Sequence, residues 1–252
     1  MDGGAVNLEI EETDRGPLAH LVIDHLRRRN AIGPAVISAL TEEARTLSER
    51  SDIRAVTLRG AGGIFASGAN VKVMRTLDQD GARAFITSLH DAIDAIRRLP
   101  VPVICVLQGH CYGAAMELAA ACDMRLADHS LVSGMPEVRV GIPSVIQANL
   151  LPRLIGWGKT SELLLTGRDV VGAENREIGF VERYVAPNDL DNALSDWTGA
   201  ILGCAPAAVR AQKAVMRGWE SDERPGVAAS IDAFAASYGT GEPQAYMPGP
   251  KT

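Results

Sequence analysis

Residues 109–123 read GHCYGAAMELAAACD, and from Gly113 onward the segment has the composition of a short helix. Apart from Glu117 and the closing aspartate, that helix is small or apolar, which predicts burial on nearly all sides. The preceding VPVICVLQG (101–109) is typical of a buried strand, and DMRLAD (123–128) of a short one. A buried helix between two strands indicates an α/β fold.

Outward from this stretch, strands and helices alternate before the chain becomes mainly helical. Two expected strands, 6–12 and 18–24, flank a turn cluster and predict a hairpin. Apolar positions repeating every three to four residues predict helices at 34–50 and 78–98, with a buried strand at 55–60 between them. Later patterns predict short strands at 131–134 and 180–185 and helices at 159–166, 173–178, 188–203, 206–220 and 226–239.

The length and this order of elements set the expected organisation. A chain of 252 residues suits one α/β domain, with or without a small appended piece. We expect a core at 1–187, followed at 188–252 by a helical region and a tail. The tail from Gly241 contains three prolines and is expected to be extended and peripheral.

Composition argues against several classes of function. The net charge of −6 disfavours nucleic-acid binding, although the run Arg27–Arg29 either meets phosphates or is a solvated turn. No apolar run of about 20 residues could span a membrane, and the acidic N-terminus lacks a secretion signal, so we expect a cytoplasmic protein. The four cysteines lack CxxC spacing, and we expect neither a disulfide nor a metal site.

Glu117 is the residue of the buried segment that requires a chemical explanation. Burial should raise the pKa of a carboxyl group there unless it is paired. One explanation is a structural ion pair, for example with Arg125. The other is a functional site, because Glu117 lies three residues after Ala114 on one face of the first helical turn. Unpaired N–H groups at that helix start could bind a developing oxyanion.

Two further segments contain candidate site residues. Glu137 follows Pro136 in an expected loop after a buried strand, and by itself it fits an ordinary exposed glutamate. The segment IFASGANVK (64–72) is a loop of small residues that enters a short helix. Its amides could face a bound group, or it is an ordinary glycine-rich turn.

Taken in order, these segments resemble those of the enoyl-CoA hydratase/isomerase, or crotonase, superfamily. The motifs that carry the resemblance are FASGANVK (65–72), GHCYGAAMELA (109–119) with Cys122-Asp123, MPEV (135–138), GIP (141–143), LPRLIG (151–156) and ELLLTG (162–167). The similarity covers roughly residues 6–240. Each motif is weak by itself, but the ordered set is specific to the family.

The resemblance implies a fold, an assembly and a set of site residues. The fold would be a crotonase ββα spiral with a C-terminal α-helical trimerisation region, assembled as a homotrimer or a dimer of trimers. The backbone N–H groups of Ala66 and Ala114 would hold a thioester oxygen beside Glu117 and Glu137. The acyl-CoA substrate would be bound by Arg28, Ala31, Ser67, Gly68, Ala69, Asn70, Val71, Gly113, Pro136, Gly141 and Ser144. Of these, Arg28, Ala31, Ala69 and Val71 would lie along the nucleotide and pantetheine of coenzyme A.

The same resemblance implies a reaction. Family members with two glutamates of this type hydrate a 2-enoyl-CoA, whereas isomerases of the family often keep one. Glu137 would be the principal proton donor, and Glu117 would orient the water and act as base. Coenzyme A is part of the substrate, and no metal or redox cofactor is needed. Isomerisation, dehydration of a 3-hydroxyacyl-CoA, thioester hydrolysis and non-catalytic acyl-CoA binding stay open as alternatives.

Several positions depart from the family pattern and leave the acyl group undetermined. Ala114 and Ser144 stand where glycine is usual, Asn70 replaces a common aspartate, and IQAN (146–149) replaces Gly-Gly-Thr-Gln. Other enzyme classes fit less well. A dinucleotide-binding G-x-G-x-x-G would need glycine where Phe65 stands, and the chain has no G-x-S-x-G of a nucleophilic hydrolase.

Overall fold

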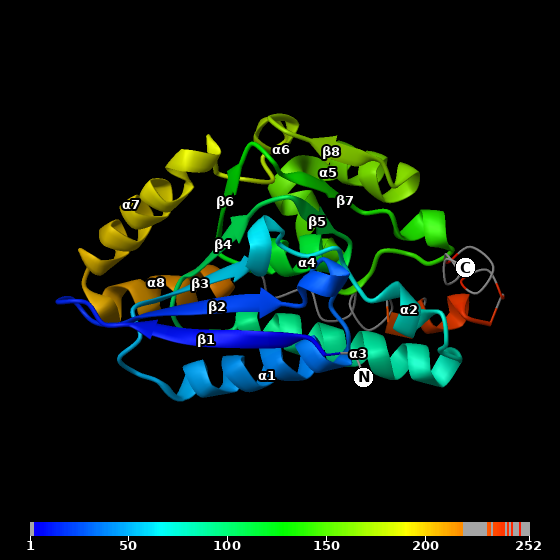
Figure 1. Cartoon of the computed structure of the whole chain (residues 1–252), viewed down its shortest axis with the longest axis horizontal. Helices are drawn as coiled ribbons and strands as arrows, with labels where there is room; N and C mark the ends of the chain where they lie inside the picture. Colours follow the sequence, from blue (N-terminus) through cyan, green and yellow to red (C-terminus); the bar gives the residue numbers. More distant parts are fainter. Residues whose placement is uncertain are drawn as a thin grey trace.

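The computed structural model describes residues 3–218, 231, 232, 234–239, 241, 243 and 247. Two sheets are packed among helices (Figure 1). The strands are β1 (Ala5–Glu11), β2 (Leu18–Asp24), β3 (Ala55–Gly60), β4 (Val103–Leu107), β5 (His110–Tyr112), β6 (Met124–Asp128), β7 (Val132–Gly134), β8 (Asp169–Val171) and β9 (Arg183–Val185). The α-helices are α1 (Pro34–Glu49), α2 (Val71–Met74), α3 (Gln79–Arg97), α4 (Ala114–Ala121), α5 (Leu151–Thr166), α6 (Glu174–Glu177), α7 (Leu190–Leu202) and α8 (Pro206–Gly218). Short 3-10 helices are η1 (Leu26–Arg28), η2 (Ala61–Gly63), η3 (Glu137–Val140), η4 (Ile146–Leu150) and η5 (Pro187–Asp189).

The larger sheet has the strand order β1-β2-β3-β4-β6-β9. Strands β1 and β2 pair antiparallel from Ala5↔Asp24 to Glu11↔Leu18, which confirms the expected hairpin. Every other pair in this sheet is parallel, so helices must carry the chain back between strands. The α/β fold class expected from the sequence is confirmed.

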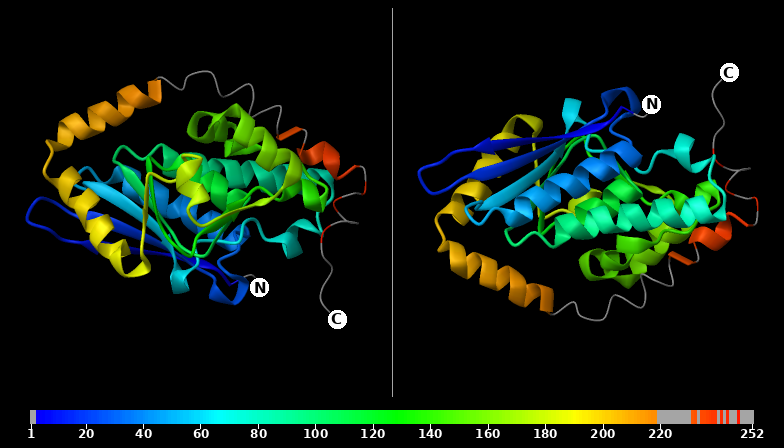
Figure 2. Two further views of the ribbon diagram at one scale, coloured as in Figure 1. Left: turned by 90° about the horizontal axis from the view of Figure 1, so that it is seen from above. Right: turned by 90° about the horizontal axis from the view of Figure 1, so that it is seen from below.

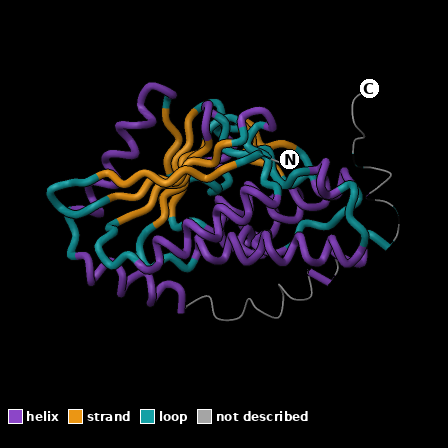
Figure 3. Tube along the Cα trace, turned by 60° about the horizontal axis from the view of Figure 1, so that its bottom comes forward, coloured by secondary structure: helices purple, strands orange, loops and turns teal. Residues whose placement is uncertain are grey.

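Helices cover both faces of the larger sheet. Helices α1 and α3 run together along one face, below the fan of strands in Figure 3, and α7 covers part of the other. Strand β4 shows how one strand contributes to the packing on both faces, because its successive side chains point to opposite sides of the sheet. Cys105 and Leu107 lie in the main core, whereas Val106 packs with Leu190 and Ala193 of α7.

The smaller sheet places the start of α4. Its order is β5-β7-β8, and β5 pairs parallel with β7 from His110↔Val132 to Tyr112↔Gly134. We had expected a turn where β5 lies and no strand at β8, because three-residue strands carry too few side chains to show a period. The chain passes from β5 through Gly113 directly into α4.

The C-terminal half differs from expectation in its boundaries. Helix α5 begins at Leu151 rather than 159, and Gly156 with φ of 76° interrupts its helical geometry. Of the helix expected at 226–239, residues 231, 232 and 234–237 are helical, residues 238 and 239 form a turn, and residues 226–230 and 233 lie outside the described residues. The tail expected from Gly241 also lies largely outside them.

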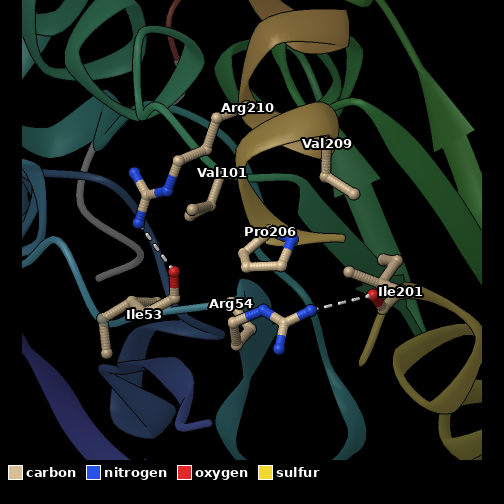
Figure 4. A pocket seen from close by; sticks show the side chains of 7 residues that line it. All are labelled: Ile53, Arg54, Val101, Ile201, Pro206, Val209 and Arg210. Atoms are coloured by element: carbon tan, nitrogen blue, oxygen red, sulfur yellow. Dashed lines mark hydrogen bonds between the residues drawn. The ribbon is translucent and has the colours of Figure 1, made fainter. Parts of the chain in front are cut away.

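Helices α7 and α8 lie at the end of the molecule opposite α2 (Figure 2). Two arginine side chains tie these helices to the residues just before β3 (Figure 4). Arg54 donates to the carbonyl of Ile201 at 3.5 Å, and Arg210 donates to the carbonyl of Ile53 at 2.8 Å. Within the described ranges, no helix combines the length and the apolar character that crossing a membrane requires.

Arg125 of β6 is a buried charge that ties the sheet to distant parts of the chain. Its guanidinium pairs with Glu182 and donates to the carbonyls of Phe180 (2.8 Å) and Cys122 (2.8 Å). The side chain of Arg125 is 3% exposed. The suggestion that Arg125 pairs with Glu117 is therefore wrong, since its donors are directed to other acceptors.

We expect Arg125→Met to lower the free energy of unfolding by about 3–5 kcal/mol, because buried carbonyls lose their donor and Glu182 loses its cation. Urea denaturation followed by circular dichroism measures this change. The matched control is Arg59→Met on β3, whose pair with Asp191 is exposed and should contribute less than about 1 kcal/mol. Equal losses in the two variants would contradict a structural role for the buried arginine.

Candidate active site

The site is organised around Gly113, the residue between β5 and α4. Its φ of 52° and ψ of −120° form a conformation that side chains rarely allow. A Cβ atom there would collide with Oε1 of Glu137, so a larger residue at this position would displace that carboxyl group. The N–H of Gly113 donates to the carbonyl of Gly134 at 2.9 Å. The N–H of Ala114, at the first position of α4, has no acceptor within the helix.

Glu117 lies in the first turn of α4, and all eight residues of this helix are buried. Glu117 is 3% exposed, and its Oε1 accepts a hydrogen bond from the N–H of Ala148 at 3.0 Å. The backbone of Val145 also hydrogen-bonds to this carboxyl group. Two amides of the segment before α5 thus hold Glu117, where an ion pair had been the alternative.

Glu137 begins the short helix η3, directly after Pro136, where a loop was expected. The residue is partly exposed, but its carboxyl group is enclosed by protein. Oε1 lies against Gly113, and Oε2 accepts the hydroxyl hydrogen of Ser144 at 3.0 Å. The two glutamates, 20 positions apart in sequence, are thus close enough for the charge of Glu137 to act on Glu117.

The electrostatics of the two carboxyl groups are coupled. Burial raises the pKa of Glu137 from 4.5 to about 7, and the Ser144 hydroxyl opposes this rise. Burial raises the pKa of Glu117 well above its usual value, and the negative charge of Glu137 raises it further. Near neutral pH the pair therefore holds a proton, and its two titration steps belong to both residues.

The loop at 65–70 lies beside the start of α4, but its free donor is not the expected one. Ala66 is completely buried, and its N–H already donates to the carbonyl of His110 at 2.9 Å. The expectation that this N–H holds a thioester oxygen therefore does not fit the geometry. The N–H of Ala69 makes no hydrogen bond to any described residue, and Ala69 is partly exposed. A Cβ on Gly68 would lie 2.7 Å from the carbonyl oxygen of Tyr112, which shows how closely the loop approaches the chain before α4.

The structure joins the expected nucleotide-side residues into one surface region. The N–H of Ala31 and the hydroxyl of Ser67 both donate to the carbonyl of Arg28, at 3.1 and 3.2 Å. Ala69 forms a parallel bridge with Ile32. Arg28 is exposed, so its side chain is accessible to an anionic group.

Other expected substrate contacts have structural roles. The Asn70 side chain is buried and caps α2, its Oδ1 accepting the N–H of Lys72 at 3.1 Å. Val71 begins that helix and is partly exposed. Gly141, with φ of 79°, ends η3 in the left-handed conformation. Ser144 contacts Glu137, a role that the sequence did not indicate.

Sequence reasoning missed the amides of Val145 and Ala148 that hold Glu117. Backbone donors carry no signal of residue type, so only the departure from the usual glycine-rich run drew attention to this segment. Between them, Ile146 has φ of 39°, which is rare for a β-branched residue. Such a conformation costs about 1–3 kcal/mol and persists where the surroundings enforce it.

The opposite end of α4 has a different character. A cavity of about 140 Å³ there is lined by Ala120–Asp123, together with side chains of α3, α5 and α8. It includes neither glutamate nor any residue of the 65–70 loop. In the part of the chain that the structure describes, no cluster of three His, Cys, Asp or Glu side chains forms a potential metal site.

Comparison with known proteins identifies the family of this chain. The family model described as enoyl-CoA hydratase/isomerase matches residues 17–243. A putative enoyl-CoA hydratase/isomerase of Bacillus subtilis is 34% identical over 220 residues, covering 86% of this chain and 85% of that protein. The short-chain-enoyl-CoA hydratase of Clostridium acetobutylicum is 29% identical over 228 residues, covering 89% and 87%.

Solved structures show the same fold. The crystal structure of an enoyl-CoA hydratase/isomerase from Xanthobacter autotrophicus Py2 superposes with a TM-score of 0.85 at 28% identity, covering 95% of this chain and 90% of that one. The fold is therefore that of the crotonases, as the sequence motifs implied. From the match over 17–243 and this structural agreement, the chain belongs to the enoyl-CoA hydratase/isomerase family.

Proposed function

We propose that this protein adds water across the 2,3 double bond of an enoyl-CoA thioester. The observation that carries the proposal is the position of the two glutamates at the start of α4. Glu137 Oε1 lies against Gly113, next to the unpaired N–H of Ala114, and the charge of Glu137 acts on Glu117. An acid and a base thus lie beside a donor for a developing oxyanion.

The oxyanion donors in this proposal are the N–H groups of Ala69 and Ala114. Ala114 is at the helix start, and Ala69 lies in the loop that approaches Tyr112. Both are backbone donors with no acceptor among the described residues. Hydrogen bonds from them to the thioester oxygen draw electrons from C3, and each such donor is typically worth about 3 kcal/mol.

The reaction then requires two proton transfers. Glu117 orients a water molecule and takes one of its protons as the oxygen bonds to C3. The π electrons of the double bond move toward C2 and the thioester oxygen, and Glu137 delivers its proton to C2. The product is a 3-hydroxyacyl-CoA, and proton exchange between the coupled carboxyl groups restores the starting state.

The number of carboxyl groups favours hydration over isomerisation. Moving a double bond transfers one proton between two carbons, which a single carboxylate can carry out. Hydration activates a water and protonates a carbon, which uses two groups. Two relatives bear names of this reaction type, the short-chain-enoyl-CoA hydratase of Clostridium acetobutylicum and a mitochondrial methylglutaconyl-CoA hydratase of mouse.

The proposal includes assembly as a homotrimer or a dimer of trimers. Large apolar side chains of α5 and β8 are exposed in the single chain, among them Trp157 (76%), Leu165 (79%) and Val171 (61%). Exposed apolar side chains of this size are typical of surfaces that another protein covers. We expect light scattering to give three or six times the mass of the chain, and a monomer at micromolar concentration would contradict this part of the proposal.

We expect Glu137→Gln to lower kcat/KM for crotonyl-CoA or a longer enoyl-CoA by about 10²–10⁴, because the amide cannot deliver a proton to C2. Thioester binding should survive, since the backbone donors stay in place. The assay follows loss of the conjugated-thioester absorbance and appearance of the 3-hydroxyacyl product. The matched control is Glu177→Gln, an exposed glutamate of α6 that should keep wild-type turnover. A wild-type protein inactive across a broad enoyl-CoA panel would overturn the proposed function.

The raised pKa of Glu137 predicts how stability depends on pH. Because the folded protein holds this proton more tightly than the unfolded chain, the free energy of unfolding should fall as pH rises from about 4.5 through about 7. The shift corresponds to about 3 kcal/mol of lost stability at high pH. Urea denaturation should therefore show Glu137→Gln to be more stable than wild type at pH 8 and similar to it near pH 5. The opposite sign would show that the carboxylate is stabilised by folding.

A further inference from the structure

Ser144 has a role that neither the family motifs nor the proposed reaction assigns. It had been expected to touch substrate, yet its hydroxyl donates to Oε2 of Glu137 at 3.0 Å. Ser144 lies in the segment between η3 and η4, seven positions after Glu137. The bond therefore joins the segment after η3 to the first residue of η3.

The two oxygens of Glu137 have different surroundings. Oε2 accepts the Ser144 hydrogen, and Oε1 lies against Gly113 beside the start of α4. In a neutral carboxyl group the carbonyl oxygen is a stronger hydrogen-bond acceptor than the hydroxyl oxygen, so the bond from Ser144 favours the carbonyl form at Oε2. The proton of the neutral acid is then favoured on Oε1, the oxygen that lies against Gly113.

The charged groups around Glu137 do not orient its carboxyl group. From α4 the group that faces it is Glu117, which repels rather than positions it. On its own element, Arg139 donates to a carbonyl at the end of α5 and interacts with Tyr112 of β5. Among the described residues, the side chain that hydrogen-bonds to the Glu137 carboxyl group is that of Ser144.

We propose that Ser144 is a positioning residue that fixes the orientation of the Glu137 carboxyl group and so keeps the transferable proton on Oε1. This role rests on the proposed hydration, in which Glu137 delivers its proton to C2. In the carboxylate form, the same hydroxyl stabilises the negative charge that remains on Glu137 after transfer.

The first experiment compares the pH dependence of kcat/KM in wild type, Ser144→Ala and Ser144→Thr. Loss of a hydrogen bond to a carboxylate should move the high-pH decline upward by about one unit in Ser144→Ala. The value of kcat should fall by about three- to tenfold with little change in KM, because the acid is misoriented and binding is not. Ser144→Thr keeps a hydroxyl and should restore both values. Ser48→Ala, on the exposed face of α1, is the matched control.

The second experiment measures the titration midpoint of the Glu137 carboxyl group directly, without following the reaction. Protein labelled with ¹³C at glutamate carboxyl carbons is titrated by NMR, and the Glu137 signal is assigned by its loss in Glu137→Gln. The midpoint should rise by about one unit in Ser144→Ala or Ser144→Gly. Unchanged midpoints together with unchanged kcat would overturn the role of Ser144 and leave hydration standing. If wild type hydrates no enoyl-CoA but the NMR midpoint shifts, the proposed function fails while the contact between Ser144 and Glu137 is upheld.

Discussion

The carboxyl group of Glu117 is buried in a helix whose other side chains are apolar, and it must find hydrogen-bond donors there. It finds them in the amides around Ile146, which bind η4 against α4. Ile146, between these two amides, has a positive φ, which is costly for a β-branched residue, so the segment that holds the carboxyl group is itself strained. The site thus depends on a buried carboxyl group and on the backbone amides that hydrogen-bond to it.

The same burial links stability to chemistry. A carboxyl group that is desolvated and next to a second one retains its proton at a pH where a surface glutamate is ionised. Such a pair weakens the folded state at high pH, but it provides both an acid and a base near neutrality. Gly113 makes this possible, because its missing Cβ atom leaves the space that Glu137 Oε1 occupies.

Two of the departures from the usual family pattern contact these carboxyl groups. Ser144 binds Glu137, and the segment from Ile146 to Ala148 holds Glu117. Neither change removes a carboxyl group or a backbone donor at the start of α4. They change how the two carboxyl groups are held.

The sequence by itself determined the α/β class, the hairpin, helices α1 and α3, and the buried helix with its glutamate. These elements are long or strongly apolar, so their periodicity and composition are unambiguous. It also identified Glu117 and Glu137 as candidates, although only family resemblance joined them.

Tertiary structure decided the short strands and the hydrogen-bond partners of the backbone groups in the site. Three-residue strands such as β5 form because neighbouring strands pair with them, and hydrogen bonds to Ala66, Val145 and Ala148 involve backbone groups that every residue carries. Which of those N–H groups is free, and which oxygen of Glu137 faces Gly113, depends on contacts between segments far apart in the chain, and local sequence patterns do not encode them.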